Sequence, residues 1–477
     1  MKVVGRNQAH NAQYILRLTG KQHRRLHQHL FPGDGKEAVA VALCGRRSGE
    51  ERHLFAIHEV VPIPDSECLI RTPNRVEWST SAVMPLVEKA MRRSMAILKI
   101  HSHPGGYPHF SKIDDASDGM FFPSVYGWVD DDQPHISAIM LPCGRIFGRV
   151  AFEDGSFAPL AFVTVCGDEV KFWHQEKQVG TVPTFTQRHM QAFGAGTTTL
   201  LRRLSIGVVG VSGTGSPVIQ ILARLGIGEL VLVDPDVVEF KNLNRILGAT
   251  MEDAKAGGYK VNVLAREIRR IGLETNVAPV ASDLLNPHVV KRIAACDIVI
   301  GCMDSVDGRD VLNRIAAYYS IPYFDVGVRL DADGQGGVDQ ICGTVHYLQP
   351  DGSSLLSRDV YTSEQLRAAG LKRASPEDYA ELRKEGYIMG VDEERPAVIS
   401  VNTFFASLLI NELLARLHPY RDDANSEFAS YTFSLTQARF INGYDGEACP
   451  VLGKLAGRGD TMPLLGMPAL SEMERAA

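Results

Sequence analysis

The sequence predicts an α/β protein built from two domains that are joined by a linker. Its 477 residues are enough for two or three domains of ordinary size. From about Gln187 onward, strand-like apolar runs alternate with helical patterns, which is typical of a parallel sheet with crossover helices. Before that point, several strand-like runs surround one helical pattern. We therefore expect domains over residues 1–165 and 187–445, with a linker over 166–186.

The first domain contains four apolar runs of strand length and one helical pattern. The linker is polar and punctuated by glycine and proline, which favours an irregular connection. The predicted elements are strands at Ala38–Leu43, Leu54–Val61, Ile97–His101 and Ile136–Met140, and a helix at Pro85–Met95.

The second domain begins with three strands and the helices between them. A glycine-rich stretch over 331–343 predicts a loop or hairpin, and a charged crossover segment spans 351–395, with a helix start at Ser375 and Pro376. A glycine- and proline-containing tail over 446–477 is expected to be mobile. The other predicted elements are strands at Ile206–Val211, Leu230–Val233 and Asp297–Gly301, and helices at Pro217–Leu225, Lys255–Ile271 and Val398–Leu417.

Composition excludes several classes of protein. The chain has 50 Lys+Arg against 56 Asp+Glu, so it lacks the basic excess of a nucleic-acid binder. No apolar run reaches the roughly 18–20 residues that span a bilayer, because Asn402, Asn411, Glu412 and Arg416 interrupt the longest one. No signal-peptide core begins the sequence. Eight Cys without a C-x-x-C pair argue against a disulfide framework. We therefore expect a cytoplasmic protein that binds neither nucleic acid nor membrane.

The first chemical motif follows the strand Ile97–His101. His101 and His103 are two residues apart, so a strand directs both imidazoles to one face, and Asp114 follows shortly after. Two histidines and one carboxylate make a three-ligand zinc set that leaves a position for water. Zinc lowers the pKa of such a water towards about 7. Glu37, at the start of Ala38–Leu43, is placed to act as the general base.

Parts of this motif are ambiguous when they are taken alone. Ser111 and Asp114 equally fit the cap of a helix, with serine at the N-cap and an acid three residues later. A lone His-x-His pair is a weak signal. The whole set, an acid before one strand and His-Ser-His-Pro then Ser-x-x-Asp after another, is specific.

In these residues the segment 10–150 resembles a JAMM (JAB/MPN) metalloprotease domain. The resemblance implies a mixed-sheet, cytidine-deaminase-like fold that cleaves peptide or isopeptide bonds at the C-terminus of ubiquitin-like proteins. It also implies the roles of five residues: zinc ligation by His101, His103 and Asp114, general acid/base catalysis by Glu37, and stabilisation of the oxyanion by Ser111.

The second motif is a glycine loop that follows a strand and opens a helix. Gly210, Gly213 and Gly215 let the backbone approach phosphates, and a helix N-terminus attracts an anion. Asp234 ends the next strand, where it can bind ribose hydroxyls. Binding of NAD is the obvious alternative. It fits poorly, because Ser212 replaces the second glycine of G-x-G-x-x-G.

Charged residues in register with this loop favour ATP over NAD. Cations at Arg245 and Lys260 would neutralise a triphosphate, and Asp304, after the strand Asp297–Gly301, would hold magnesium. A dehydrogenase needs none of these groups. The residues that carry the pattern are Arg188, Asp236, Asn244, Arg245, Lys260 and Asp304.

With these motifs, residues 187–415 resemble the ThiF/MoeB/ubiquitin-activating adenylation fold, a Rossmann-like domain. The resemblance implies that ATP and magnesium are used to adenylate the C-terminal glycine of a ubiquitin-like or sulfur-carrier protein. It implies a homodimer through this domain, in which Arg188 reaches the partner's site. The implied ligand roles are phosphate binding by Asn244, Arg245 and Lys260, ribose or magnesium binding by Asp236, and magnesium binding by Asp304.

Activating enzymes that conjugate also use a cysteine to form a thioester. Residues 343–448 contain no cysteine, so Cys342 and Cys449 are the candidates. Five other cysteines lie in or beside apolar runs and are expected to be buried structural thiols: Cys44, Cys143, Cys166, Cys296 and Cys302.

Together, the two motifs predict a bifunctional enzyme that resembles fusions in bacterial ubiquitin-like conjugation operons. One domain activates a ubiquitin-like protein and the other matures or removes it, with a conjugating enzyme as a further partner. Two alternatives stay open: processing of a sulfur carrier for cofactor or cysteine biosynthesis, and a scaffold that binds the modifier without catalysis.

Overall fold

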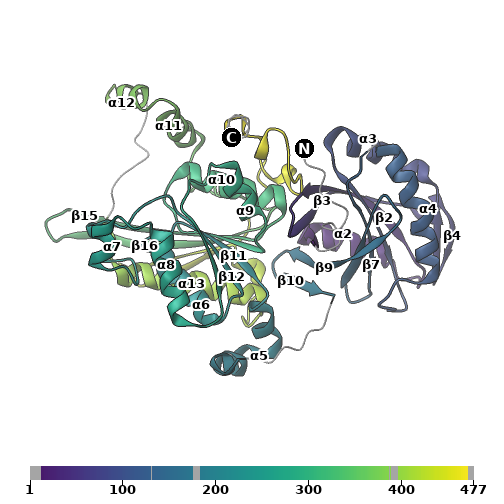
Figure 1. The fold of residues 1–477 in the computed structure, drawn as a ribbon, viewed down its shortest axis with the longest axis horizontal. Coiled ribbons are helices and arrows are strands. Elements are labelled where there is room, and N and C mark those ends of the chain that lie inside the picture. The colour runs from purple at the N-terminus through teal and green to yellow at the C-terminus, as the bar shows by residue number, and fades with distance from the viewer. Residues whose placement is uncertain (1–11, 130, 176–182, 386, 388–395, 471–477) are drawn as a thin grey trace. The chain divides into compact units, whose positions relative to one another are not determined.

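The computed structural model describes residues 12–129, 131–175, 183–385, 387 and 396–470. These residues form two compact units, each with its own sheet (Figure 1). Parts of the predicted linker (176–182), crossover segment (386 and 388–395) and tail (471–477) lie outside the described residues. The first unit comprises Met1–Gln178, Ala317–Ser320 and Leu455–Met462, and the second comprises Val179–Ala316, Ile321–Lys454 and Pro463–Ala477.

The first unit contains an eight-stranded sheet of mixed direction. The strands are β1 (Gln13–Thr19), β2 (Val39–Arg47), β3 (Arg52–Pro62), β6 (Ala96–Ser102), β7 (His135–Met140), β8 (Ile146–Ala151), β9 (Phe157–Cys166) and β10 (Val170–His174). Their order is β1-β3-β2-β6-β7-β8-β9-β10, and β1 pairs in parallel with both β3 and β9, so the sheet closes on itself. A separate hairpin is formed by β4 (Cys68–Thr72) and β5 (Arg75–Trp78).

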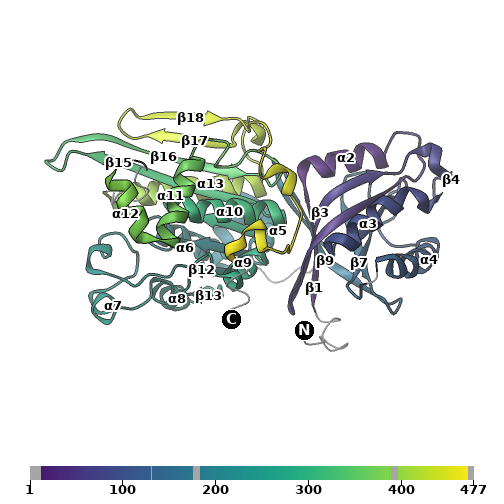
Figure 2. The same cartoon turned by 90° about the horizontal axis from the view of Figure 1, so that it is seen from above.

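Helices cover both faces of this sheet (Figure 2). Successive side chains of a strand point to opposite faces. Leu98 and Ile100 of β6 therefore pack into the core with α2 (Gly20–Leu30), whereas Ile97 packs with α3 (Met84–Arg93) and α4 (Lys112–Val129). Lys99 and His101 share the face of Ile97. The end of β6 thus presents its polar side chains to the side that carries α3 and α4.

The second unit contains a sheet that is parallel in one half and antiparallel in the other. The strands are β11 (Ser205–Val209), β12 (Glu229–Val233), β13 (Asn276–Val280), β14 (Ile298–Gly301), β15 (Tyr323–Ala332), β16 (Val338–Leu348), β17 (Ser430–Ser434) and β18 (Arg439–Gly443). The order β13-β12-β11-β14-β15-β16-β17-β18 places β12 and β14 on opposite sides of β11. Ligands of such sheets bind at the carboxyl ends of the strands beside this reversal.

Helices connect the parallel strands. The apolar α13 (Ile399–Leu417) packs against α6 (Gly215–Leu225), β15 and β16 and contributes to the core of this unit. No helix of the described segments is long and apolar enough to span a bilayer. The helices are α5 (Gln187–Leu201), α6 (Gly215–Leu225), α7 (Met251–Ala256), α8 (Lys260–Ile271), α9 (Pro287–Ala294), α10 (Val306–Tyr319), α11 (Ser363–Ala374), α12 (Pro376–Lys384) and α13 (Ile399–Leu417).

Three predicted features differ in the structure, which also adds the helices α2 and α4 and the strands β1, β8 and β9 to those predicted for the first domain. The single helix predicted over Lys255–Ile271 is two helices, because Gly257 adopts a left-handed conformation (φ 62°) that ends α7 before α8 begins. Part of the predicted linker is the strand β10, which pairs with β9. Residues 446–470 of the predicted mobile tail pack into the fold and bury Cys449, Leu465 and Leu470.

Leu455–Met462 belong to the first unit although they lie far along the chain. The Gly45 amide donates to the carbonyl oxygen of Gly457 over 3.0 Å, and the Asp460 amide donates to the carbonyl oxygen of Arg46 over 2.7 Å. These backbone hydrogen bonds hold the segment against β2.

Candidate functional site

Two histidines at the end of β6 face a carboxylate of α4. The Nε2 atoms of His101 and His103 lie 3.2 Å apart. The Asp114 carboxylate approaches both rings, with Oδ1 3.0 Å from His101 Nε2 and Oδ2 3.4 Å from His103 Nε2. All three side chains are buried. The strand and the helix thus bring together the two imidazoles and the aspartate that the sequence motif contains.

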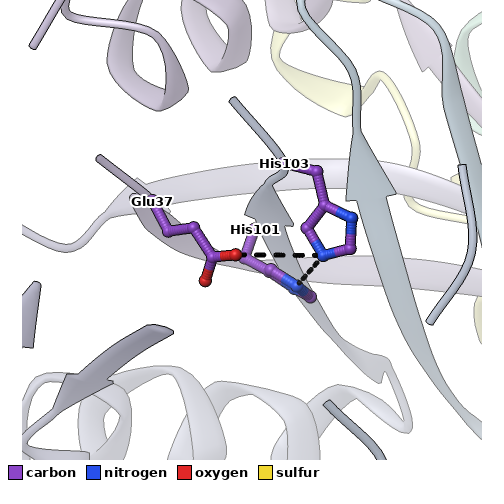
Figure 3. Close-up of side chains that lie close together, drawn as sticks. All are labelled: Glu37, His101 and His103. Atoms are coloured by element: carbon purple, nitrogen blue, oxygen red, sulfur yellow. Dashed lines mark hydrogen bonds and ion pairs between the residues drawn. The ribbon is translucent and has the colours of Figure 1, made fainter. Parts of the chain in front are cut away.

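The carboxylate of Glu37 faces the His103 ring, with His101 beside them (Figure 3). The antiparallel pairing of β2 with β6 sets Val39 against His101, which brings Glu37 to the level of His103. Glu37 Oε1 is 4.0 Å from His103 Nε2. Glu37, His101 and His103 each offer one ligand atom, and these three atoms lie within 4.8 Å of one another.

The hairpin strand β4 holds the backbone of Glu37. The Glu37 amide donates to the carbonyl oxygen of Thr72 over 2.9 Å, and Arg71 Nε donates to the carbonyl oxygen of Glu37 over 3.0 Å. The Arg71 guanidinium also pairs with Asp34 at 2.5 Å and Asp65 at 2.9 Å. Glu37 therefore has a fixed backbone position.

Burial and charge give the two carboxylates different protonation behaviour. Burial raises the pKa of Glu37 to about 7; the nearby Asp114 adds to the shift and His103 opposes it. Burial would also raise the pKa of Asp114, but hydrogen bonds from His101 and His103 hold it well below its usual range. Glu37 can thus exchange a proton near neutral pH while Asp114 stays ionised.

The donor set fits a zinc ion. His103 Nδ1 donates to the carbonyl oxygen of Tyr107 over 2.8 Å, which leaves Nε2 free to ligate. Because the Nε2 atoms of His101 and His103 face each other beside an ionised carboxylate, a shared cation satisfies all three groups. Two imidazole nitrogens and a carboxylate oxygen are ligands that zinc takes in proteins.

Ser111 caps α4, as expected of serine at the N-cap with an acid three residues later. The Ser111 amide donates to Asp114 Oδ2 over 2.6 Å, and the Asp114 amide donates to Ser111 Oγ over 3.2 Å. Since the same Asp114 faces the histidines, the cap fixes the position of the carboxylate at the start of the helix.

The glycine loop of the second unit runs from the end of β11 into α6. Gly210 has a positive φ of 86°, and a Cβ at Gly215 would clash with the carbonyl oxygen of Gly210. Asp234 holds this loop, because its carboxylate accepts hydrogen bonds from the amides of Val211 and Asp236, both over 2.9 Å. Burial raises the pKa of Asp234, against the effect of Lys260. In this structure the Asp234 carboxylate thus binds the backbone amides of the glycine loop and of the segment after β12.

Cations lie beside the loop. Lys260, the first residue of α8, is buried, with Nζ 2.7 Å from Asp236 Oδ2 and 3.9 Å from Asp234 Oδ1. Arg245 lies against Gly213, and its Nη1 donates to Asn244 Oδ1 over 3.2 Å. Two cations therefore flank a backbone that only glycine permits.

Asp304 and Arg188 occupy different positions relative to this loop. Asp304 is exposed just beyond β14, which pairs in parallel with β11, so it lies at the same edge of the sheet as the glycine loop. Arg188 is exposed on α5 and donates to Gln191 on the same helix over 3.3 Å.

The two candidate thioester cysteines differ in exposure. Cys342 lies partly exposed within β16, between Arg329 and Ser434 of the neighbouring strands, and burial raises the pKa of its thiol. Cys449 is 2% exposed. Cys342 is therefore the more accessible of the two.

Asn402 is a site residue that the sequence analysis missed. It lies in the first turn of α13 and is 6% exposed, and a Cβ at Gly213 would clash with its Nδ2. Its side-chain amide makes no hydrogen bond within the described residues, whereas its backbone amide donates to the carbonyl oxygen of Val398. The signal in the sequence is a polar residue in the first turn of a mainly apolar helix, which Asn411, Glu412 and Arg416 interrupt as well.

The second unit is similar to known proteins. Residues 186–449, more than half of the chain, match the ThiF family. The SAMP-activating enzyme E1 of Haloferax volcanii is 33% identical over 145 residues, 30% of this chain and 49% of that protein. Ubiquitin-like modifier-activating enzyme 5 of Culex quinquefasciatus is 27% identical over 159 residues, 31% and 38% of the two chains.

A third relative combines two activities in its name. The adenylyltransferase and sulfurtransferase MOCS3 of Sus scrofa is 36% identical over 113 residues, 24% of this chain and 24% of that protein. The chain thus spans half or less of the length of these curated relatives.

Proposed function

Because the chain belongs to the ThiF family, we propose that its second unit uses ATP and magnesium to adenylate the C-terminus of a ubiquitin-like or sulfur-carrier protein. The observation that carries this proposal is the glycine loop with Lys260 and Arg245 beside it and Asp304 at the same edge of the sheet. The names of the relatives support the same class of substrate.

In this reaction the carboxylate of the carrier attacks the α-phosphate of ATP, and pyrophosphate leaves. The amides of the glycine loop, Lys260, Arg245 and Asn244 bind phosphate oxygens, because fixed donors and cations stabilise the charge that develops during transfer. Asp304 binds the magnesium, which supplies further positive charge, and Asp236 binds ribose or that same ion. The free amide of Asn402 donates to a phosphate oxygen at Gly213.

Exchange of pyrophosphate into ATP tests this proposal directly. Exchange that requires an added carrier protein ending in Gly-Gly is the expected result. No exchange with any ubiquitin-like or sulfur-carrier protein would exclude the adenylation function.

We further propose that Arg188 acts across a homodimer. On its own helix it contacts Gln191, and a two-fold dimer can deliver the guanidinium to the partner's phosphates. Chains with Arg188→Ala and chains with Lys260→Met are each expected to lack exchange activity. Mixed dimers are expected to regain activity in one site of the two. Mixed dimers without activity would show that Arg188 does not act in trans.

For the first unit we propose a zinc isopeptidase that cleaves at the C-terminus of the carrier. The ligands are His101, His103 and Asp114, and the close approach of their donor atoms supports the proposal. Zinc supplies a Lewis acid that makes water nucleophilic near neutral pH. Glu37 would accept a proton from the attacking water at Oε1 and pass it to the amine that leaves when the C–N bond breaks. The Ser111 hydroxyl donates to the oxyanion.

Glu37→Gln separates metal binding from proton transfer. The variant is expected to keep about one zinc per chain and to lose cleavage of a carrier fusion by at least about 100-fold, because the base is removed and the ligands remain. Zinc content and cleavage rate are measured on the same preparation. The exposed Glu67→Gln serves as the control, and full activity of Glu37→Gln would exclude the assigned role.

We propose that the protein acts in the cytoplasm, and that the adenylated carrier is used there in one of two ways: conjugation or sulfur transfer. Conjugation would pass the carrier through Cys342 or Cys449, or directly to a conjugating enzyme, whereas the sulfurtransferase relative favours a thiolated carrier. A substitution of either cysteine should leave exchange intact in both cases. Loss of transfer to a partner enzyme after Cys342→Ala or Cys449→Ala identifies the thioester residue. A scaffold without catalysis would bind the carrier but show neither activity.

A further inference from the structure

A second pair of charged residues joins β6 to α4 beside the histidine–aspartate cluster. Lys99 lies two residues before His101 on the strand, and Asp118 lies four residues after Asp114 on the helix. Lys99 Nζ is 2.5 Å from Asp118 Oδ1, while His101 Nε2 is 3.0 Å from Asp114 Oδ1. Two side-chain pairs, Lys99–Asp118 and His101–Asp114, thus join β6 to α4.

The spacings of the two connections match. Residues two apart on a strand lie on one face, about 6.6 Å from each other, and residues four apart on a helix lie on one face, about 6 Å from each other. Both pairs can therefore form together when α4 runs along β6 in a single register.

The Lys99–Asp118 pair is buried, and each of its two residues has a further hydrogen-bond partner. Asp118 is 0% exposed, and its Oδ2 accepts from Arg149 Nη2 over 2.7 Å and Nε over 3.1 Å. Lys99 Nζ donates to Ser117 Oγ over 2.9 Å. A buried ion pair adds little net stability over an apolar pair, since both charges lose water. Buried ion pairs are better attested as groups that fix how one element is aligned on another, here α4 on β6.

Helix α4 offers two carboxylates, Asp114 and Asp118, on one face and one turn apart. If α4 shifted by one turn, Asp118 would face His101 and Asp114 would leave the cluster. We infer that Lys99 is a positioning residue: by pairing with Asp118 it sets the register of α4 on β6 and so reserves Asp114 for His101 and His103. This inference rests on the proposed zinc site.

Zinc affinity tests the inference without the need for a substrate. In the full chain, Lys99→Met is expected to weaken zinc binding about 10–100-fold in competition with a chromophoric chelator, as is typical when a residue that supports a ligand is lost. The matched control is Arg416→Met, which breaks another buried pair, Arg416–Glu412, and should leave zinc affinity unchanged. Equal affinity of Lys99→Met and the unsubstituted chain overturns the inference.

A double-substitution cycle distinguishes register from general loss of stability. Asp114→Asn should cost at least about 100-fold in zinc affinity in the unsubstituted chain, but less than about 10-fold in a Lys99→Met/Arg149→Met background, where neither cation holds Asp118 and it can replace Asp114. Additive losses overturn the inference.

If Lys99→Met does not fold, the double variant Lys99→Met/Asp118→Leu removes both charges and leaves Arg149 paired with Asp115. It should bind zinc within about 3-fold of the unsubstituted chain, because no second carboxylate then competes. Zinc binding as weak as that of Asp114→Asn overturns the inference. Absence of zinc binding by the unsubstituted chain instead overturns the proposed zinc site, and the role of Lys99 with it.

Discussion

Replacing Lys260 by methionine is expected to lower carrier-dependent exchange of pyrophosphate into ATP by at least about 100-fold. A fixed donor aimed at developing charge contributes about 10²–10³ in rate. The ammonium group of Lys260 has a fixed position, because the residue is buried at the start of α8 and its Nζ lies 2.7 Å from Asp236 Oδ2. Methionine keeps most of the apolar stem and removes the charge. The rate is measured at saturating ATP and carrier.

Two further variants make this result interpretable. Asp304→Asn should cause a comparable loss, and because Asp304 is exposed, thermal unfolding should change little. The exposed Lys255→Met, on the neighbouring α7, is the control and should retain full exchange. Zinc content of the first unit should stay constant in all three variants. Exchange that survives both Lys260→Met and Asp304→Asn would contradict the proposed nucleotide site.

Replacing His103 by alanine is expected to reduce bound zinc from about one per chain to less than about a tenth, and to abolish cleavage of a carrier fusion. The substitution removes one of two imidazole ligands, and leaves His101 with Asp114. Because metal affinity depends on the full number of ligands, two of them retain zinc poorly. Zinc is measured by elemental analysis after gel filtration.

His109→Ala is the matched control for this prediction. His109 lies exposed in the loop that follows the motif and stacks edge-on against Tyr107 without facing His101. Its removal should change neither zinc content nor cleavage. If His103→Ala retains a full equivalent of zinc, or if cleavage survives chelation, the proposed zinc isopeptidase function of the first unit is wrong.

Much of each candidate site follows from local sequence patterns. β6 and β11 are short apolar runs that end in polar or glycine residues, so periodicity alone predicts both the strands and the position of the motifs behind them. The helix predicted over Val398–Leu417 differs from α13 by one residue, because its apolar pattern is long and uninterrupted by proline.

Contacts between distant segments could not be predicted in this way. The pairing of Lys99 with Asp118 depends on how a helix packs on a strand, and neither residue differs locally from a surface charge. The segment of β10 resembles part of a linker because polar residues, glycine and proline flank it, and it gains strand structure by pairing with β9. Asn402 reaches Gly213 from a helix almost two hundred residues downstream. Such contacts can be identified only from the tertiary structure, because secondary-structure propensity depends on residues that are neighbours along the chain.

The return of Leu455–Met462 to the first unit bears on how the chain folds during synthesis. The first sheet can close only after β9 has been synthesised, because β9 pairs with β1. The amide of Gly45 and the carbonyl of Arg46 gain their partners later still, after β11 to β18 have been synthesised. Domains usually complete themselves in the order of translation. Here the first unit is completed only after most of the second has been synthesised. Until then the end of β2, beyond its pairing with β6, lacks these backbone partners. Exposed strand backbone of this kind favours binding by chaperones and pairing between chains.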